Sequence, residues 1–272
     1  MSDDATRLSG YVEVWWDAVG RFTALLDELE PDDWSAPTDL AGWDVKACAS
    51  HTAHLERVLA GHGEEDAEVG EPPHVTSIMG LYTEIGVVNR RDVPPADVVA
   101  ELRAVAAERH AQLLADPPTD ASVKPDTIFG GVPWTWETLL RNRPLDVWMH
   151  EQDVRRAVGR PGGLDSPPAQ HTTDYLTESF GYVVAKKAGL PSGTTAVLDV
   201  AGSPTVAVEV DETGRGRRLP EVPGSADVVL RMDREPFICL AGGRRTPPDG
   251  AVTVEGDATL ARRVLDAMAT TP

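Results

Sequence analysis

Asp146 and His150 stand four residues apart, between Pro144 and Gly159. At that spacing in a helix both side chains leave the same face, about one turn apart. A carboxylate and an imidazole placed in this way can bind one divalent metal ion if a third ligand arrives from elsewhere in the fold. His51 is the best candidate for that ligand. The sequence therefore predicts a metal site formed by His51, Asp146 and His150.

Each of these residues also has a simpler explanation. Asp146 would lie in the first turn of a helix beginning at Pro144, where the helix dipole favours a carboxylate by about 0.3–1 kcal/mol without any metal. His150 lies at the edge of an apolar face and can be a hydrogen-bonded core histidine, whereas His51 and His54 can both be surface residues. Three further carboxylates compete as ligands: Glu56, Glu151 and Asp153.

Other catalytic chemistries find little support in the sequence. It contains no G-x-S-x-G elbow, P-loop, G-x-G-x-x-G or H-E-x-x-H motif. The two cysteines, Cys48 and Cys239, form no C-x-x-C pattern, which excludes a thiolate-cage zinc site. Either cysteine could act as a nucleophile, but small buried hydrophobes are the expected role.

The elements that must position these residues are mainly helices. Apolar residues repeat at spacings of four and three from Leu8 to Leu29, which predicts an amphipathic helix with Trp15 and Trp16 in the core. Asp44 is a plausible N-cap for a second helix. Further helices are expected over 78–88, 98–114, 134–141 and 144–158. The four long helices predict an antiparallel bundle.

The stretch from Arg160 to Pro168 contains three prolines and two glycines and breaks the helical pattern. Beyond it, β-rich runs at 196–201 and 205–210 form an expected hairpin, with strands at 226–232 and 251–254 and helices at 169–188, 234–241 and 258–269. We therefore expect two domains, residues 1–164 and 165–272. The predicted fold is an α plus α/β two-domain chain, a helical bundle followed by a small α+β domain.

The overall charge limits the partners. Among 272 residues, 44 acidic and 25 basic side chains give a formal charge of −19. Nucleic acid and anionic membranes are therefore not expected as partners. The polar, acidic N-terminus lacks the pattern of a signal peptide, and no apolar run is long enough for a membrane span. We expect a cytoplasmic location; the sequence does not define the oligomeric state.

Several motifs resemble one known family. Gly42-Trp43-Asp44-Val45 is followed by His51, Asp146 to Val154 reads DVWMHEQDV, and Gly159-Arg160-Pro161 comes next. With the segment from Val252 to Ala261, VTVEGDATLA, this order resembles the mycothiol-dependent maleylpyruvate isomerase family. The resemblance implies a DinB-like four-helix bundle and a sterol-carrier-like C-terminal domain.

The resemblance also has implications for the site. It selects His51 over His54 and implies that His51, Asp146 and His150 bind a divalent metal such as zinc, although the isomerase itself has Glu at the position of Asp146. It further implies an arginine of the C-terminal domain that helps to bind substrate. Arg244 is our candidate for this catalytic residue; its rivals are Arg231, Arg234 and Arg245.

The function implied is a metal-dependent enzyme that uses mycothiol, a small-molecule thiol, as cofactor. The thiol would add to a small electrophilic substrate. Addition, bond rotation and elimination would make the enzyme an isomerase, whereas addition alone would make it a transferase. The alternative is a non-catalytic binding module with a structural or silent metal site.

Overall fold

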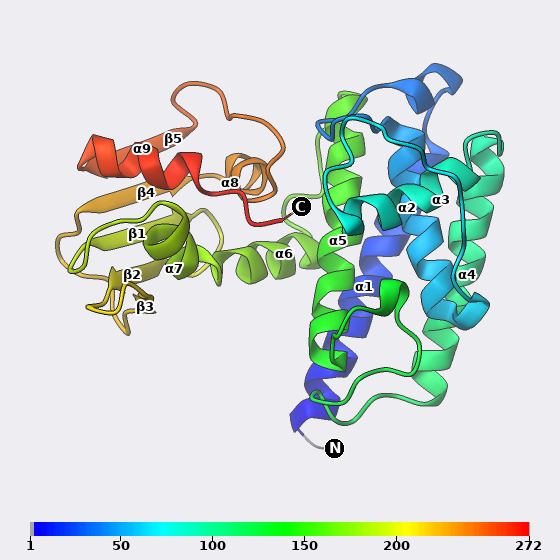
Figure 1. Ribbon diagram of the computed structural model, residues 1–272, viewed down its shortest axis with the longest axis horizontal. Helices are drawn as coiled ribbons and strands as arrows, with labels where there is room; N and C mark the ends of the chain where they lie inside the picture. The colour runs from blue at the N-terminus through cyan, green and yellow to red at the C-terminus, as the bar shows by residue number, and fades with distance from the viewer. Residues whose placement is uncertain (1–2, 272) are drawn as a thin grey trace. The chain divides into compact units, whose positions relative to one another are not determined.

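The structure, a computed structural model, describes residues 3–271. It divides into two compact units, the first ending at Gly163 and the second beginning at Leu164. The first unit is helical and the second contains a β-sheet (Figure 1). Together they make the predicted fold class, a helical bundle followed by a small α+β unit.

The first unit contains the following helical elements. They are α1 (Asp3–Asp27), the 3₁₀ turn η1 (Pro31–Ser35), α2 (Val45–Arg57), the π-helical turn η2 (Val58–His62), α3 (Ile78–Asn89), α4 (Pro95–Ala115), the 3₁₀ turn η3 (Phe129–Gly131) and α5 (Trp136–Ala157). Helices α1, α5, α2 and α4 contact one another in a ring, with α3 packed against α2. This ring is the bundle that the sequence predicts.

The helix directions differ from a simple antiparallel bundle. Arg7 near the start of α1 binds Glu137 at the start of α5, so these two helices run parallel. His62, just after α2, lies 2.7 Å from Glu108 near the end of α4, so α2 and α4 also run parallel, opposite to α1 and α5 (Figure 1). The cause is the long connection that contains α3, because it returns the chain before α4 begins.

Helix α1 shows why the apolar period predicts these elements. Leu8, Val12, Trp15 and Phe22 lie on its buried face, as the alternation of four and three residues requires. Trp16 is a different case: its side chain is 39% exposed, so the expectation that it lies in the core is wrong. A residue next to Trp15 points about 100° away from the buried stripe.

Helix α5 corrects a prediction about Pro144. The sequence predicts that a helix begins at this proline, but α5 runs without interruption from Trp136 to Ala157 with Pro144 inside it. Proline removes one backbone hydrogen bond and usually ends or kinks a helix. Here Leu140, Leu145 and Trp148 are buried on both sides of the proline, and their packing in the bundle outweighs the local cost.

The second unit contains helices on a five-stranded sheet. Its elements are α6 (Pro167–Thr177), α7 (Phe180–Tyr182), the π-helical turn η4 (Val183–Lys187), β1 (Thr195–Val200), β2 (Val206–Val210), β3 (Gly216–Arg218), β4 (Val228–Met232), α8 (Arg234–Ala241), β5 (Val252–Gly256) and α9 (Ala258–Asp266). The strand order is β3-β2-β1-β4-β5. Helix α9 packs on β4 and β5, and η4 packs on β2, β3 and α9, so both cover one face.

The pairing of the strands confirms the predicted hairpin. Strands β1 and β2 are antiparallel, with Thr195 opposite Glu209, whereas the central pair β1 and β4 is parallel. Strand β3 has no counterpart among the sequence predictions. It is a three-residue edge strand containing Arg217 and Arg218, and it lacks the apolar alternation by which strands are recognised.

The expectations about the cysteines and about membrane-spanning helices can be compared with the structure. Both Cys48 and Cys239 are buried, as expected of small apolar residues. Among residues 3–271, none of the helices combines the length and the apolar character that crossing a bilayer requires.

Candidate metal centre

The first unit brings together the three residues predicted as ligands. His51 lies on α2, and Asp146 and His150 lie one turn apart on α5. Asp44 caps the first turn of α2, its side chain accepting a hydrogen bond from the backbone N–H of Ala47 at 2.8 Å. One potential ligand atom from each of the three lies within 4.8 Å of the others.

The distances suit a shared cation better than direct hydrogen bonds. Nε2 of His51 is 3.6 Å from Oδ2 of Asp146, and Nε2 of His150 is 3.7 Å from Oδ1. Both separations exceed the range of a hydrogen bond. Ligand bonds of about 2.0–2.1 Å at tetrahedral angles would place neighbouring ligand atoms roughly 3.3 Å apart. The two distances go to different oxygens of Asp146, and one atom from each residue lies within 4.8 Å of the others, so the three would move closer together to fill three positions of a tetrahedral site.

One of the three residues is partly exposed. His51 and His150 are buried, whereas the side chain of Asp146 is 23% exposed. Solvent therefore reaches part of the Asp146 side chain. Catalytic metal sites differ from structural ones in keeping one coordination position open.

Electrostatics favour the ligand forms of two of these groups. Burial lowers the pKa of His51 and so favours the neutral imidazole that a metal requires. Burial raises the pKa of Asp146, but the Arg143 guanidinium and the neighbouring imidazoles more than offset this, and its pKa is well below the ordinary value. Asp146 is therefore ionised near neutral pH.

A second carboxylate lies behind His150. Nδ1 of His150 is 3.3 Å from Oδ2 of Asp153 without hydrogen-bond geometry, while the other oxygen of Asp153 is bound by Arg156. Arg156 also donates to Asp39 at 2.7 Å. In metal sites, a carboxylate that accepts a hydrogen bond from a ligand histidine fixes the ring so that its other nitrogen points at the metal. The buried thiol of Cys48 also lies within 4.8 Å of this His150–Asp153 pair.

An aromatic wall closes another side of the cluster. The ring centroid of Trp43 is 5.0 Å from that of His51 and 5.8 Å from that of His150. Its indole N–H donates to Glu84 at 2.8 Å, and His74 lies 3.2 Å from the same carboxylate oxygen. The Gly-Trp pair before α2 thus contributes an indole fixed beside both imidazoles.

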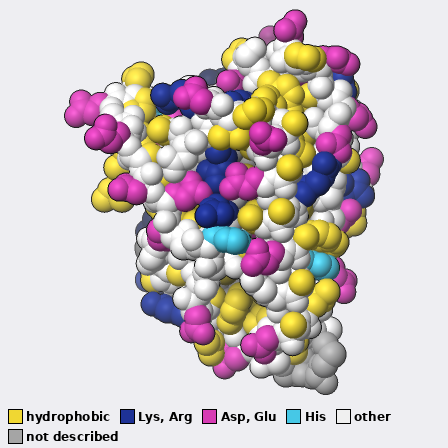
Figure 2. Space-filling view, turned by 90° about the vertical axis from the view of Figure 1, so that its right-hand side faces the viewer, with side chains coloured by type: hydrophobic (Ala, Val, Ile, Leu, Met, Phe, Trp, Pro, Cys, Tyr) yellow, Lys and Arg dark blue, Asp and Glu magenta, His cyan; other side chains and the backbone are white. Residues whose placement is uncertain are grey.

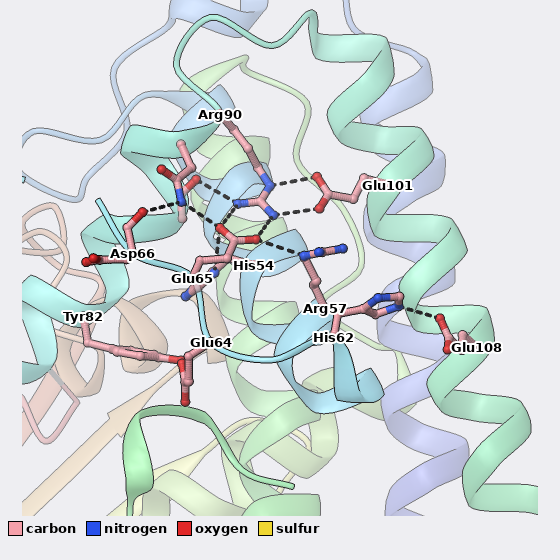
Figure 3. A network of polar contacts seen from close by, with 12 residues as sticks. His54, Arg57, His62, Glu64, Glu65, Asp66, Tyr82, Arg90, Glu101 and Glu108 are labelled. Carbon is pink, nitrogen blue, oxygen red and sulfur yellow. Dashed lines mark hydrogen bonds and ion pairs between the residues drawn. The ribbon is translucent and has the colours of Figure 1, made fainter. Parts of the chain in front are cut away.

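The competing residues have other partners. The carboxylate of Glu56 is bound by Arg109 and Arg143, and that of Glu151 is bound by Arg155 at 2.7 Å. His54 is fully buried, so the expectation that it could be a surface residue is wrong, as it is for His51. Figure 3 shows that His54 belongs to a separate polar network, with Nδ1 3.2 Å from Glu65.

Arg244 belongs to the second unit, where it lines a pocket of about 410 Å³. Its Nη1 donates to the carbonyl of Gly242 at 2.6 Å. Its neighbour Arg245 and Arg262 of α9 line the same pocket, so guanidinium groups dominate its charged lining, although Asp249 and Asp266 are also present.

The other rivals of Arg244 have structural contacts. Arg234 is buried and donates to Gln170 at 2.7 Å, and Arg231 on β4 pairs with Glu255 and Asp199. Arg245 likewise pairs with Glu235 at 3.6 Å, and Arg244 donates to Gly242, so these contacts do not rank the four arginines.

The donor set supports a metal on chemical grounds. Two neutral imidazole nitrogens and one carboxylate oxygen make a typical set for catalytic zinc. Two neighbours of the site, Glu84 and Arg143, were not predicted from the sequence, whereas Asp153 was expected only as a competing ligand and Trp43 only as part of the Gly-Trp motif. Only Arg143 and Asp153 carried a local signal, because each lies three residues from a predicted ligand on the same helix.

Fold and site together define a class of protein. It has two units, a helical bundle that carries a His–Asp–His cluster and an α+β unit that follows it. Two family models match it: "Mycothiol maleylpyruvate isomerase N-terminal domain" over residues 15–155 and "MDMPI C-terminal domain" over residues 170–263. The chain belongs to the mycothiol maleylpyruvate isomerase family.

Solved structures share this fold. A crystal structure of a mycothiol-dependent maleylpyruvate isomerase matches with a TM-score of 0.54 at 18% identity, covering 91% of this chain and 92% of the other. A histidine-to-alanine mutant of such an isomerase matches with a TM-score of 0.55 at 17% identity, with the same coverage. At this identity the likeness is one of fold. A search of curated proteins finds no match.

The surface agrees with the acidic composition. On the face shown in Figure 2, acidic side chains are scattered among basic and apolar ones, without a continuous basic area.

Proposed function

We propose that this protein is a metal-dependent enzyme that uses a mycothiol-type thiol to isomerise, or to conjugate, a small electrophilic substrate. The observation that carries the proposal is the convergence of His51, Asp146 and His150, with the Asp146 side chain partly exposed. Family membership supplies the thiol and the reaction class. The alternative of a non-catalytic binding module is not favoured by these observations.

The chain's own residues would have distinct roles. His51, Asp146 and His150 would hold a divalent ion, for which zinc suits the donor set best, and the ion would lower the pKa of a thiol beside it. Trp43 would limit the space beside the imidazoles and exclude water from that side. Arg244 is our candidate for binding a carboxylate of the substrate.

Metal content tests the ligand set. Protein purified without added metal should contain about one equivalent of a divalent ion, and His51→Ala should lose most of it. His62→Ala is a matched control, because His62 pairs with Glu108 outside the cluster and its loss should leave metal content unchanged. Equal metal content in His51→Ala and wild type would refute the proposed ligand set.

Thermal stability tests the thiol. Mycothiol should raise the melting temperature of the metal-loaded protein and not that of the metal-free protein, because ligand binding stabilises only the form that binds it. Equal shifts in both forms would argue against a thiol site at the metal. The cytoplasmic location and the substrate stay predictions.

A further inference from the structure

We propose that Arg143 is a positioning residue that holds one carboxylate oxygen of Asp146 and leaves the other for a metal ion. The proposal rests on the proposed function, because it concerns how the His51–Asp146–His150 cluster would bind its metal. It adds to that function a residue that sets the coordination number, and with it the availability of an open position for the thiol.

The contact between Arg143 and Asp146 is direct. Nη1 of Arg143 donates to Oδ2 of Asp146 at 2.9 Å, the oxygen that also lies 3.6 Å from Nε2 of His51, and Oδ1 faces Nε2 of His150 at 3.7 Å. A metal that took both carboxylate oxygens would have to share Oδ2 with the guanidinium, whereas Oδ1 makes no such contact with Arg143. The geometry therefore favours coordination through a single oxygen, which leaves a fourth position vacant for a substrate atom.

Arg143 has little freedom to turn away. Its side chain is fully buried, and Nε and Nη2 donate to the same oxygen of Glu56, Oε1, at 3.0 and 2.8 Å. The planar guanidinium thus bridges two carboxylates, with Glu56 on one side and Asp146 on the other. Such a fork is rigid, because rotating it to release Asp146 would also break both hydrogen bonds to Glu56.

Glu56 is itself fixed by two other helices. Arg109 on α4 donates to its Oε2 at 2.6 Å, and the indole N–H of Trp15 on α1 donates to its Oε1 at 2.9 Å. Glu56 lies on α2 and Arg143 on α5, so all four helices of the bundle meet at this carboxylate. The position of Asp146 is thereby tied to the frame of the whole bundle.

The charges of this network balance. Two carboxylates, Glu56 and Asp146, face two guanidinium groups, Arg109 and Arg143. A simple structural role would require only that the buried charges be paired. Pairing already calls for Asp146, because Glu56 faces two guanidinium groups. The feature that points to positioning is that this second carboxylate is a predicted metal ligand, of which Arg143 holds Oδ2.

The test uses Co²⁺ as a spectroscopic probe in the full-length protein. Four-coordinate Co²⁺ absorbs visible light more strongly than five-coordinate Co²⁺, so absorption intensity reports the coordination number. Wild type should bind Co²⁺ with the intense absorption. Arg143→Lys keeps the charge but cannot bridge both carboxylates. It should lose the intense absorption and bind metal roughly 10–100-fold more weakly.

Two further variants make the result decisive. Arg155→Lys changes an arginine on the same helix that pairs with Glu151, and it should keep the wild-type spectrum. The double variant Glu56→Gln/Arg143→Gln removes one carboxylate and one guanidinium, which leaves Arg109 and Asp146 equal in charge count, and it should behave as Arg143→Lys does. Circular dichroism confirms that each variant is folded.

The outcomes separate the two proposals. If either Arg143 variant is folded and binds Co²⁺ with wild-type affinity and spectrum, the positioning role is overturned while the metal site stands. If wild type itself binds no Co²⁺, the proposed function fails first, and the positioning role fails with it.

Discussion

Replacing Arg90 by methionine should destabilise the helical unit by about 3–5 kcal/mol, the usual cost of breaking a buried ion pair from one side. Arg90 follows α3, and its side chain is only 5% exposed. It donates to both oxygens of Glu65, at 2.7 and 3.0 Å, and to both oxygens of Glu101, at 2.7 and 2.8 Å (Figure 3).

The magnitude follows from these contacts. Four charge-assisted hydrogen bonds at about 1.5–3 kcal/mol each would give more than 6 kcal/mol if they were additive. They are not additive, because Glu65 and Glu101 are partly exposed and can bind water once Arg90 is removed. Methionine also retains much of the apolar packing of the side chain. The expected loss therefore lies below the sum.

Urea unfolding monitored by tryptophan fluorescence measures this loss of stability in the helical first unit. All seven tryptophans lie between residues 15 and 148, in the first unit. For a slope of roughly 2–3 kcal/mol per molar urea, the midpoint should fall by about 1–2 M. The second unit contains no tryptophan and does not contribute to the signal.

Arg103→Met is the matched control. Arg103 also bridges helices, pairing with Asp27 of α1, but both side chains are about half exposed. Exposed pairs typically contribute less than about 1 kcal/mol. If the two variants shift the midpoint equally, or if Arg90→Met costs less than about 1 kcal/mol, the reasoning from burial is refuted.

Two further predictions use the same assay. Gly86→Ala should destabilise the first unit by about 1–3 kcal/mol, because its new methyl group would lie 2.3 Å from Cβ of His54. Gly20→Ala places its methyl group in open space and should stabilise the unit by about 0.5–1 kcal/mol. If both variants changed the free energy of unfolding in the same direction, this reasoning would be contradicted. Burial raises the pKa of Glu65, but hydrogen bonds from His54 and Arg90 outweigh this and lower it. The stability difference between wild type and Glu65→Gln should therefore be fully present above about pH 4.3 and shrink as pH falls below it; a difference that grows on acidification would contradict the assigned direction.

Much of the fold could be predicted because the relevant signals are local. The apolar period from Leu8 to Leu29 and the N-cap Asp44 predict helices that the structure confirms. Pro144 misled the prediction because a local rule met a tertiary effect, the packing of α5 on both sides of the proline. Strand β3 was missed because neither Arg217 nor Arg218 carries an apolar signal.

The site shows the same division. The spacing of Asp146 and His150 places them on one face, and the structure brings His51 to them; their binding of a metal stays a prediction. The continuous α5 also removes the simplest alternative for Asp146, since this residue is not in the first turn of its helix. Glu56 and Arg143 are separated by 87 residues, and their contact depends on how the helices pack, which no local pattern specifies.

The meeting of four helices at Glu56 has a consequence for α4, which supplies none of the three ligands. Arg109 joins α4 to Glu56, and Glu56 holds Arg143 beside Asp146. If the cluster binds a metal as proposed, metal binding and the packing of α4 on the bundle are therefore thermodynamically linked. Metal at about 1,000 times its dissociation constant adds roughly 4 kcal/mol to the folded state. Slower amide hydrogen exchange would therefore extend into α4, away from the ion itself.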